Sequence, residues 1–212
     1  MKKIVCFGDS NTYGYIPALG ERFDIDTRWA GRLKRSLAEK GCIVAEEGKN
    51  GRTTVFDDPA DEDRNGSLVL GDVLKRNDPI DCIVIMLGTN DCKIKFGADE
   101  NIIVNGLDVL VSMIRLFGPD IRILIVSPAV INEGVKSGRF AENFNDLSIG
   151  TSERLAEKYR ELARRRDCAF LDAAEYISTS PKDGIHLDAQ AHRELASAVE
   201  NCLVSKCPEL FS

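Results

Sequence analysis

The chain has no long apolar run, because its best apolar stretches, residues 82–87 and 121–126, are far shorter than the roughly 20 residues that cross a bilayer. Its seven cysteines form no Cys-x-x-Cys pair and mostly lie inside apolar runs, which predicts reduced core residues. The N-terminus also lacks the hydrophobic segment and the cleavage site of a secretory signal. We therefore expect a cytoplasmic protein without a membrane span or a disulfide framework.

Positive charge is also scarce, since 28 lysines and arginines face 34 aspartates and glutamates and leave a net charge of −6. This balance argues against nucleic acid or an anionic membrane as the main partner and favours a small molecule. Hydrophobic residues make up 43% of the chain and charged residues 29%, which excludes disorder, collagen and coiled coil. At 212 residues, the chain is expected to form one domain over residues 1–212.

Short apolar runs of strand length alternate along the chain with segments whose apolar residues recur at helical spacing. Strands that are apolar on both faces predict a parallel sheet covered by helices on each side and joined by right-handed crossovers. The expected fold class is therefore α/β, a three-layer α/β/α sandwich with a five-stranded parallel sheet. The expected strands are 4–7, 43–45, 83–87, 121–126 and 169–171, and the expected helices are 29–40, 67–76, 102–117, 152–166 and 189–204.

Two segments interrupt this alternation, residues 48–66 and 129–150, and both are expected to be long loops. The first contains the acidic run 57–63, which lacks the spacing of a calcium loop and is expected to be a solvated surface turn. Apolar residues of the second segment either pack against other copies of the chain, narrowing the crevice at the strand ends, or fold back on their own domain. We expect a homo-oligomer. The residues in question are Val130, Ile131, Phe140 and Phe144.

Polar residues follow the strands at the carboxyl edge of the predicted sheet, where open parallel sheets bind ligands. Ser10 follows the first strand and is the candidate nucleophile, which needs a base to remove its proton. Asp183 lies three residues before His186, where its carboxylate can orient the imidazole and stabilise the imidazolium. His192 lies in the last expected helix without such a neighbour and is interpreted as a surface or packing residue. Ser10, Asp183 and His186 are therefore the expected catalytic residues.

A carbonyl under attack by a serine also needs preorganised donors for the negative charge on its oxygen. The backbone N–H groups of Ser10 and Gly51 and the side-chain amide of Asn90 are placed to converge there. Each residue also has an ordinary structural explanation, namely a helix N-cap for Ser10, an Asn-Gly turn for Gly51 and a turn amide for Asn90. Their joint placement after the strands favours an acyl-transfer site with an oxyanion hole.

Three other kinds of site fit these residues less well. The α/β-hydrolase elbow needs Gly-x-Ser-x-Gly, but Thr12 stands at its last position. A flavodoxin-like module that binds a nucleotide or flavin phosphate without catalysis is disfavoured because Asp9 would repel a phosphate and no Gly-x-x-x-x-Gly-Lys occurs. A metal-dependent hydrolase is disfavoured because the two histidines lack a supporting ligand pattern. No cofactor or metal is therefore expected.

These motifs resemble the SGNH (GDSL-type) hydrolase family, whose four named residues would be Ser10, Gly51, Asn90 and His186. The resemblance covers nearly the whole chain, is closest to the bacterial arylesterase/acyltransferase branch, and implies a flavodoxin-like fold. One departure is Asn11, which stands where the family has leucine and therefore bears on substrate fit. The motifs are Gly8-Asp9-Ser10, Asn50-Gly51-Arg52, Gly88-Thr89-Asn90-Asp91 and Asp183-Gly184-Ile185-His186.

The resemblance implies a serine esterase that hydrolyses short-chain or aryl esters through an acyl-serine intermediate, with acyl transfer to alcohols as a further reaction. A carbohydrate O-acetyl esterase of the same family is the alternative. Under either interpretation, the partner of the protein would be a small-molecule ester. Asn11, Tyr13 and Asn50 are expected to bind substrate. Aromatic residues near the nucleophile, including Tyr15 and Trp29, either line the site or pack a helix onto the sheet.

Overall fold

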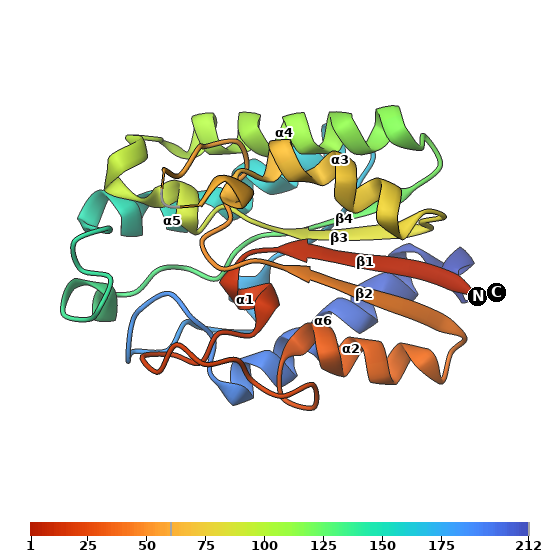
Figure 1. The fold of residues 1–212 in the computed structure, drawn as a ribbon, viewed down its shortest axis with the longest axis horizontal. Helices are drawn as coiled ribbons and strands as arrows, with labels where there is room; N and C mark the ends of the chain where they lie inside the picture. Colours follow the sequence, from red (N-terminus) through yellow and green to blue (C-terminus); the bar gives the residue numbers. More distant parts are fainter. Residues whose placement is uncertain (60, 212) are drawn as a thin grey trace.

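The computed structural model describes residues 1–59 and 61–211, so Ala60 in the predicted loop 48–66 and Ser212 lie outside the described residues. The described chain is a three-layer α/β/α sandwich around one five-stranded parallel sheet with the strand order β2-β1-β3-β4-β5 (Figure 1). The strands are β1 Lys2–Gly8, β2 Cys42–Gly48, β3 Cys82–Met86, β4 Arg122–Val126 and β5 Ala169–Leu171.

In the part of the chain that the structure describes, six α-helices connect these strands or cover the sheet (Figure 1). Short 3₁₀ turns lie in the connections, mostly beyond the carboxyl ends of the strands. The α-helices are α1 Ser10–Tyr13, α2 Trp29–Ala38, α3 Gly66–Asn77, α4 Glu100–Phe117, α5 Asp146–Arg165 and α6 Ala189–Lys206. The 3₁₀ turns are η1 Glu62–Arg64, η2 Asn90–Cys92, η3 Ile94–Phe96, η4 Glu133–Lys136, η5 Ala173–Glu175 and η6 Pro208–Leu210.

The core consists of two apolar layers, one on each face of the sheet. Along β1, Ile4 and Cys6 point into the layer under α2 and α6, whereas Val5 and Phe7 point into the layer under α3, α4 and α5. All four side chains are fully buried. Figure 1 shows α2 and α6 below the sheet and α3, α4 and α5 above it. Coverage on both faces explains why these strands are continuously apolar.

The winding direction changes between β1 and β3. From β1 the chain passes through α2 to β2, then crosses back through α3 to β3 on the other side of β1. A parallel sheet opens a crevice at the carboxyl ends of its strands at such a point. α1 lies there, packed so closely on β2 that a Cβ at Gly48 would lie 2.2 Å from the backbone nitrogen of Tyr13. The first turn after β1 therefore needs glycine at position 48.

All ten predicted elements are present, and all but one of them differ from the prediction at one or both ends. The predicted strand 169–171 matches β5 at both ends, while α2 ends at Ala38 rather than Lys40. The short helix α1 was not predicted, because four residues carry no helical periodicity. α5 begins at Asp146, six residues earlier than expected, where the Asn145 side chain accepts a hydrogen bond from the backbone N–H of Ser148 at 3.1 Å in a capping box.

The segment 129–150 folds back on its own chain. Ile131 and Phe144 are buried, Val130 and Phe140 are half-buried, and residues 146–150 belong to α5. Packing against other copies was expected because these four apolar side chains would otherwise be exposed. Since they are buried or half-buried within the chain itself, that argument does not apply to them. The homo-oligomer stays a prediction. Among the described residues, no helix is long and apolar enough to cross a membrane.

His192 is a packing residue and not a surface residue. Its side chain is fully buried in α6, and its Nδ1 accepts a hydrogen bond from the Trp29 backbone N–H at 3.3 Å. The Phe23 ring contacts it edge-on, with the ring centroids 5.3 Å apart. Burial lowers the pKa of His192 to about 3, so the ring stays neutral in the folded protein at neutral pH.

We predict that His192→Asn makes the protein more resistant to acid. The unfolded chain binds a proton on His192 below about pH 6.5, whereas the folded protein does so only near pH 3. The wild type therefore loses stability as pH falls through that window. Asparagine does not titrate and keeps an acceptor for Trp29. From about pH 7 to about pH 4.5, denaturant unfolding should show about 2 kcal/mol less loss of stability in the variant than in the wild type. Equal losses would contradict the assignment.

Candidate active site

Ser10, His186 and Asp183 form a hydrogen-bonded chain at the carboxyl edge of the sheet. Ser10 Oγ lies 3.0 Å from His186 Nε2, and His186 Nδ1 lies 2.9 Å from Asp183 Oδ2. All three residues are buried, with Ser10 the most exposed at 8%. The arrangement places a hydroxyl, a base and an orienting carboxylate within direct proton-transfer reach, as nucleophilic catalysis requires.

The Asp183 carboxylate is held by the backbone as well as by the imidazole. Its Oδ1 accepts hydrogen bonds from the N–H groups of Ile185 and His186, and its Oδ2 accepts one from Ala18 at 3.0 Å. Burial alone would raise the pKa of Asp183, but the hydrogen bonds from His186 and the backbone hold it below its ordinary value. Asp183 is therefore a fixed negative charge beside His186 Nδ1, where its hydrogen bond orients the imidazole.

Two aromatic rings fix the plane of the imidazole. Tyr15 stacks on His186 with centroids 4.1 Å apart and an interplanar angle of 25°, and Phe140 meets the same ring edge-on at 5.3 Å. Tyr15 therefore belongs to the site, as one of the two interpretations of the nearby aromatics allows. Trp29 follows the other interpretation, since it is buried in the core under α2.

Asn11 and Tyr13 do not line the cavity that contains Ser10, contrary to expectation. Asn11 is buried, donates to the Ile185 carbonyl at 3.0 Å and accepts from Leu187 N–H at 3.1 Å. It therefore positions the segment that carries His186. Tyr13 packs under the Arg22 guanidinium, 4.5 Å from the ring centroid. Both differ from expectation because α1 is a helical turn, so side chains that follow Ser10 point in different directions.

The residues expected to bind the oxyanion converge on the same cavity. Ser10 is the first residue of α1, Gly51 lies in the turn after β2 at φ +80°, and Asn90 begins η2 after β3. Asn90 Nδ2 donates to the Arg52 carbonyl at 3.1 Å, which uses one of its two amide hydrogens. No described acceptor takes the N–H of Ser10 or of Gly51. The arrangement leaves donors for a substrate oxygen.

Arg52 and Asp91 support this turn and had no predicted role. The buried Arg52 guanidinium donates to the Gly8 carbonyl at 2.9 Å and to the Glu47 carbonyl, and it stacks on Phe7. Asp91 Oδ1 accepts from Thr54 N–H at 2.9 Å and from its hydroxyl. Arg52 ends the motif Asn50-Gly51-Arg52, and Asp91 ends the motif Gly88-Thr89-Asn90-Asp91. These positions were the signal in the sequence that could have indicated a supporting role.

Burial dominates the electrostatics behind the expected oxyanion donors. It raises the pKa of Asp91 to about 6, and burial together with the smaller effect of the nearby Asp91 charge raises the pKa of Asp9 to about 7. Burial also lowers the pKa of Arg52 to about 10, which leaves it protonated. Among the described residues, no group of three or more His, Cys, Asp or Glu is arranged to hold a metal ion.

The cavity beside Ser10 has a volume of about 420 Å³. Asp58, expected in a solvated turn, is buried in its wall at 5% exposure because Arg64 and Lys95 pair with it. Asn50 lines the cavity, in agreement with its expected placement. The lining residues are Ser10, Tyr15, Asn50, Gly51, Asp58, Arg64, Asn90, Lys93, Lys95, Arg139, Phe140, Asn143, Phe144, Ile185 and His186.

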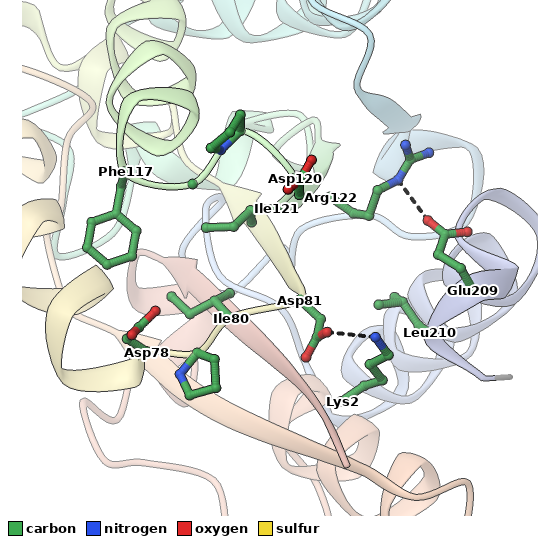
Figure 2. Close-up of a pocket in the computed structure, with 13 residues that line it drawn as sticks. Lys2, Asp78, Ile80, Asp81, Phe117, Asp120, Ile121, Arg122, Glu209 and Leu210 are labelled. Atoms are coloured by element: carbon green, nitrogen blue, oxygen red, sulfur yellow. Dashed lines mark hydrogen bonds and ion pairs between the residues drawn. The ribbon is translucent and has the colours of Figure 1, made fainter.

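A second cavity of about 370 Å³ lies between the N-terminal ends of the strands, away from Ser10 (Figure 2). Two ion pairs cross its wall, Lys2 with Asp81 and Arg122 with Glu209, both at 2.9 Å. Its described lining contains no serine, cysteine or histidine. The hydrogen-bonded Ser10 and His186 therefore belong to the cavity at the carboxyl edge.

Comparisons with known proteins agree with this geometry. The sequence model of the GDSL-like Lipase/Acylhydrolase family matches residues 6–194. The chain is similar to the structure of a carbohydrate acetylesterase family member from Sinorhizobium meliloti, with 38% identity, a TM-score of 0.91 and 98% and 100% of the two chains covered. It is also similar to the aryl esterase of M. smegmatis, with 34% identity, a TM-score of 0.90 and coverage of 97% and 100%. No curated protein matches significantly.

We predict that Asn11→Ala lowers kcat more than it raises KM. The variant loses both hydrogen bonds that hold residues 185–187, so the imidazole moves relative to Ser10 Oγ. Misplacement of the imidazole relative to Ser10 Oγ is expected to lower kcat by about tenfold to a hundredfold. Steady-state kinetics with a nitrophenyl acetate measures the effect, and Tyr13→Phe on the same turn is the matched control with wild-type kcat. A variant that changes KM alone would instead indicate direct substrate contact.

Proposed function

The chain belongs to the GDSL-like lipase/acylhydrolase family, and on that premise we propose that Ser10, His186 and Asp183 are the catalytic triad of this ester hydrolase. The observation that carries the assignment is the hydrogen-bonded chain from Ser10 Oγ through His186 to Asp183, with distances of 3.0 Å and 2.9 Å. The family match disfavours a non-catalytic module that binds a nucleotide or flavin.

Acylation begins at Ser10. His186 Nε2 accepts the proton of Ser10 Oγ as that oxygen attacks the ester carbonyl, and Asp183 stabilises the imidazolium. The stacked Tyr15 ring keeps the imidazole in the plane that this transfer needs. The imidazolium then gives its proton to the leaving alkoxide, and an acyl-serine remains.

Negative charge on the carbonyl oxygen meets the N–H groups of Ser10 and Gly51 and the Asn90 amide. The Arg52 carbonyl fixes the direction of the Asn90 amide, and the Arg52 guanidinium ties the Gly51 turn to β1 and β2. These donors need little rearrangement when the charge develops, which is the condition under which they lower the barrier most.

Deacylation repeats the same proton transfers with water as the attacking group. His186 accepts a proton from the water, and Ser10 leaves as the restored hydroxyl. An alcohol in the same position gives acyl transfer in place of hydrolysis. We propose both reactions, and product analysis with added methanol measures their ratio.

Short-chain and aryl esters are the proposed substrates, supported by the 34% identity to the aryl esterase of M. smegmatis and by a cavity of about 420 Å³ that accommodates a small ester. A carbohydrate O-acetyl ester is the second candidate, and the 38% identity to the carbohydrate acetylesterase family member supports it. Parallel assays with a nitrophenyl acetate and with an acetylated sugar discriminate the two.

We predict that a fluorophosphonate labels the protein once, on Ser10. The expected mass increase corresponds to one phosphonyl group, and peptide mapping should place it on the peptide that contains Ser10. Ser10→Ala and His186→Ala should abolish both labelling and hydrolysis, whereas the packing variant His192→Asn should keep activity. An adduct on another residue, or hydrolysis that continues in Ser10→Ala, would contradict the triad.

We predict that Asn90→Ala lowers kcat by about a hundredfold to a thousandfold, the usual cost of losing one oxyanion donor. The loss should appear with KM nearly unchanged, since the hydrogen bond strengthens only in the transition state. The neighbouring pocket residue Asn143 provides the matched control, because Asn143→Ala removes an amide that is not an oxyanion donor. Similar losses of kcat in both variants would remove the special role of Asn90.

A further inference from the structure

Positive charge collects in the active-site cavity of a protein whose net charge is −6. Five charged side chains line this cavity beside the triad, and only Asp58 is acidic. The other four form what we call the cationic wall, defined as Arg64, Lys93, Lys95 and Arg139.

Asp58 accounts for part of this charge. It pairs with Arg64 at 2.8 Å and with Lys95 at 2.9 Å. Lys93 makes no ion pair with any carboxylate among the described residues, and Arg139 donates to the Tyr15 hydroxyl at 3.3 Å. Outside the lining, Asp61 lies 3.9 Å from Arg64 Nε, and the charge of Asp9 acts on Lys93 together with that of Asp58. Within the cavity lining itself, one carboxylate faces four cations, so the wall keeps net positive charge.

Lys93 is the most informative of the four. Its side chain is half-buried, and burial lowers the pKa of its ammonium to about 8. The folded protein therefore holds a partly desolvated cation in the cavity at an electrostatic cost. A bound anion would offset that cost.

The cationic wall also has a defined place relative to the reacting ester. Lys93 N–H donates to the Asn90 carbonyl at 3.2 Å, and a Cβ on Gly51 would lie 2.7 Å from Arg64 Nε. The Arg64 guanidinium thus stands beside Gly51, and the backbone of Lys93 is bonded to the residue that carries the Asn90 amide, while both side chains line the same cavity. The leaving alcohol belongs near His186, which protonates it, together with Tyr15 and Phe140. The acyl chain is left to extend towards Lys93 and Arg64.

We propose that this active site prefers esters whose acyl part carries a negative charge, such as the half-esters of short dicarboxylic acids, and that Lys93 with Arg64 and Lys95 binds this charge. The proposal rests on the proposed esterase function and specifies its substrate class. A carboxylate that reaches Lys93 forms a charge-assisted hydrogen bond, which a neutral acyl group of the same shape cannot form.

The test compares two isosteric pairs of esters by kcat/KM. Monoethyl succinate and ethyl levulinate differ in charge at the far end of the acyl part. Acetoxyacetate and acetoxyacetone carry the same difference on the alcohol part. We expect a preference for the anion of about tenfold or more in the first pair only, and we expect added salt to reduce it. Hydrolysis is followed by proton release at constant pH.

Lys93→Met removes the unpaired cation while keeping most of its apolar length. In this variant the ratio of the acyl pair should fall by about tenfold, towards unity. Lys34→Met is the matched control, because Lys34 is exposed on α2 and its loss changes the net charge equally. Its ratio should equal that of the wild type.

The outcomes separate the two proposals. Hydrolysis of ethyl levulinate that depends on Ser10 supports the proposed function whatever the acyl ratio is. Equal rates for the acyl pair, a preference in the alcohol pair alone, or a ratio unchanged by Lys93→Met would each overturn the inference while leaving the esterase intact. No hydrolysis of any ester would instead refute the proposed function.

Discussion

The buried Arg52 guanidinium is the contact on which the geometry of the candidate site depends. The guanidinium donates to the Gly8 carbonyl at the end of β1 and to the Glu47 carbonyl near the end of β2. The backbone carbonyl of Arg52 accepts a hydrogen bond from the Asn90 side chain after β3. Three strand ends are thereby joined through one residue. Its burial is tolerable because it hydrogen-bonds to two carbonyls and stacks on Phe7 at 4.4 Å. The proposed oxyanion donors consequently belong to the sheet, although they stand on loops.

The layers of the fold could be predicted from sequence because strand and helix differ in period and the strands are apolar on both faces. Elements with a strong pattern, such as β5 and α4, end within two residues of their predicted bounds. The pattern failed where side chains are polar or where a helix has only a single turn. The first turns of α5 follow a capping box made by Asn145 and Ser148, without the apolar spacing that would reveal them. α1 consists of one turn.

The candidate site divides in a similar way. Spacing and motif resemblance brought Ser10, Asp183 and His186 together, and the distances among them agree. Spacing and motifs do not indicate in which direction each side chain points. Asn11, for example, points inward and holds residues 185–187. The cationic wall was missed because it is assembled from three separate segments around η1, η3 and η4. The buried Asp58 holds two of its members in place. No pattern along one segment reports such an assembly.

The separation of the proposed catalytic residues along the chain also has a consequence for biosynthesis. Ser10 and His186 stand 176 residues apart, so the proposed nucleophile leaves the ribosome long before its proposed base has been translated. Ser10 follows β1, which pairs with β3 in the sheet. The His186 segment, in contrast, follows β5 at the far edge of the sheet. Contacts this distant in sequence form late in folding, since closing the chain between them has a large entropic cost. If the proposed triad performs the hydrolysis, a nascent chain that lacks the His186 segment is thus inactive, and activity begins only when translation and sheet formation are both complete.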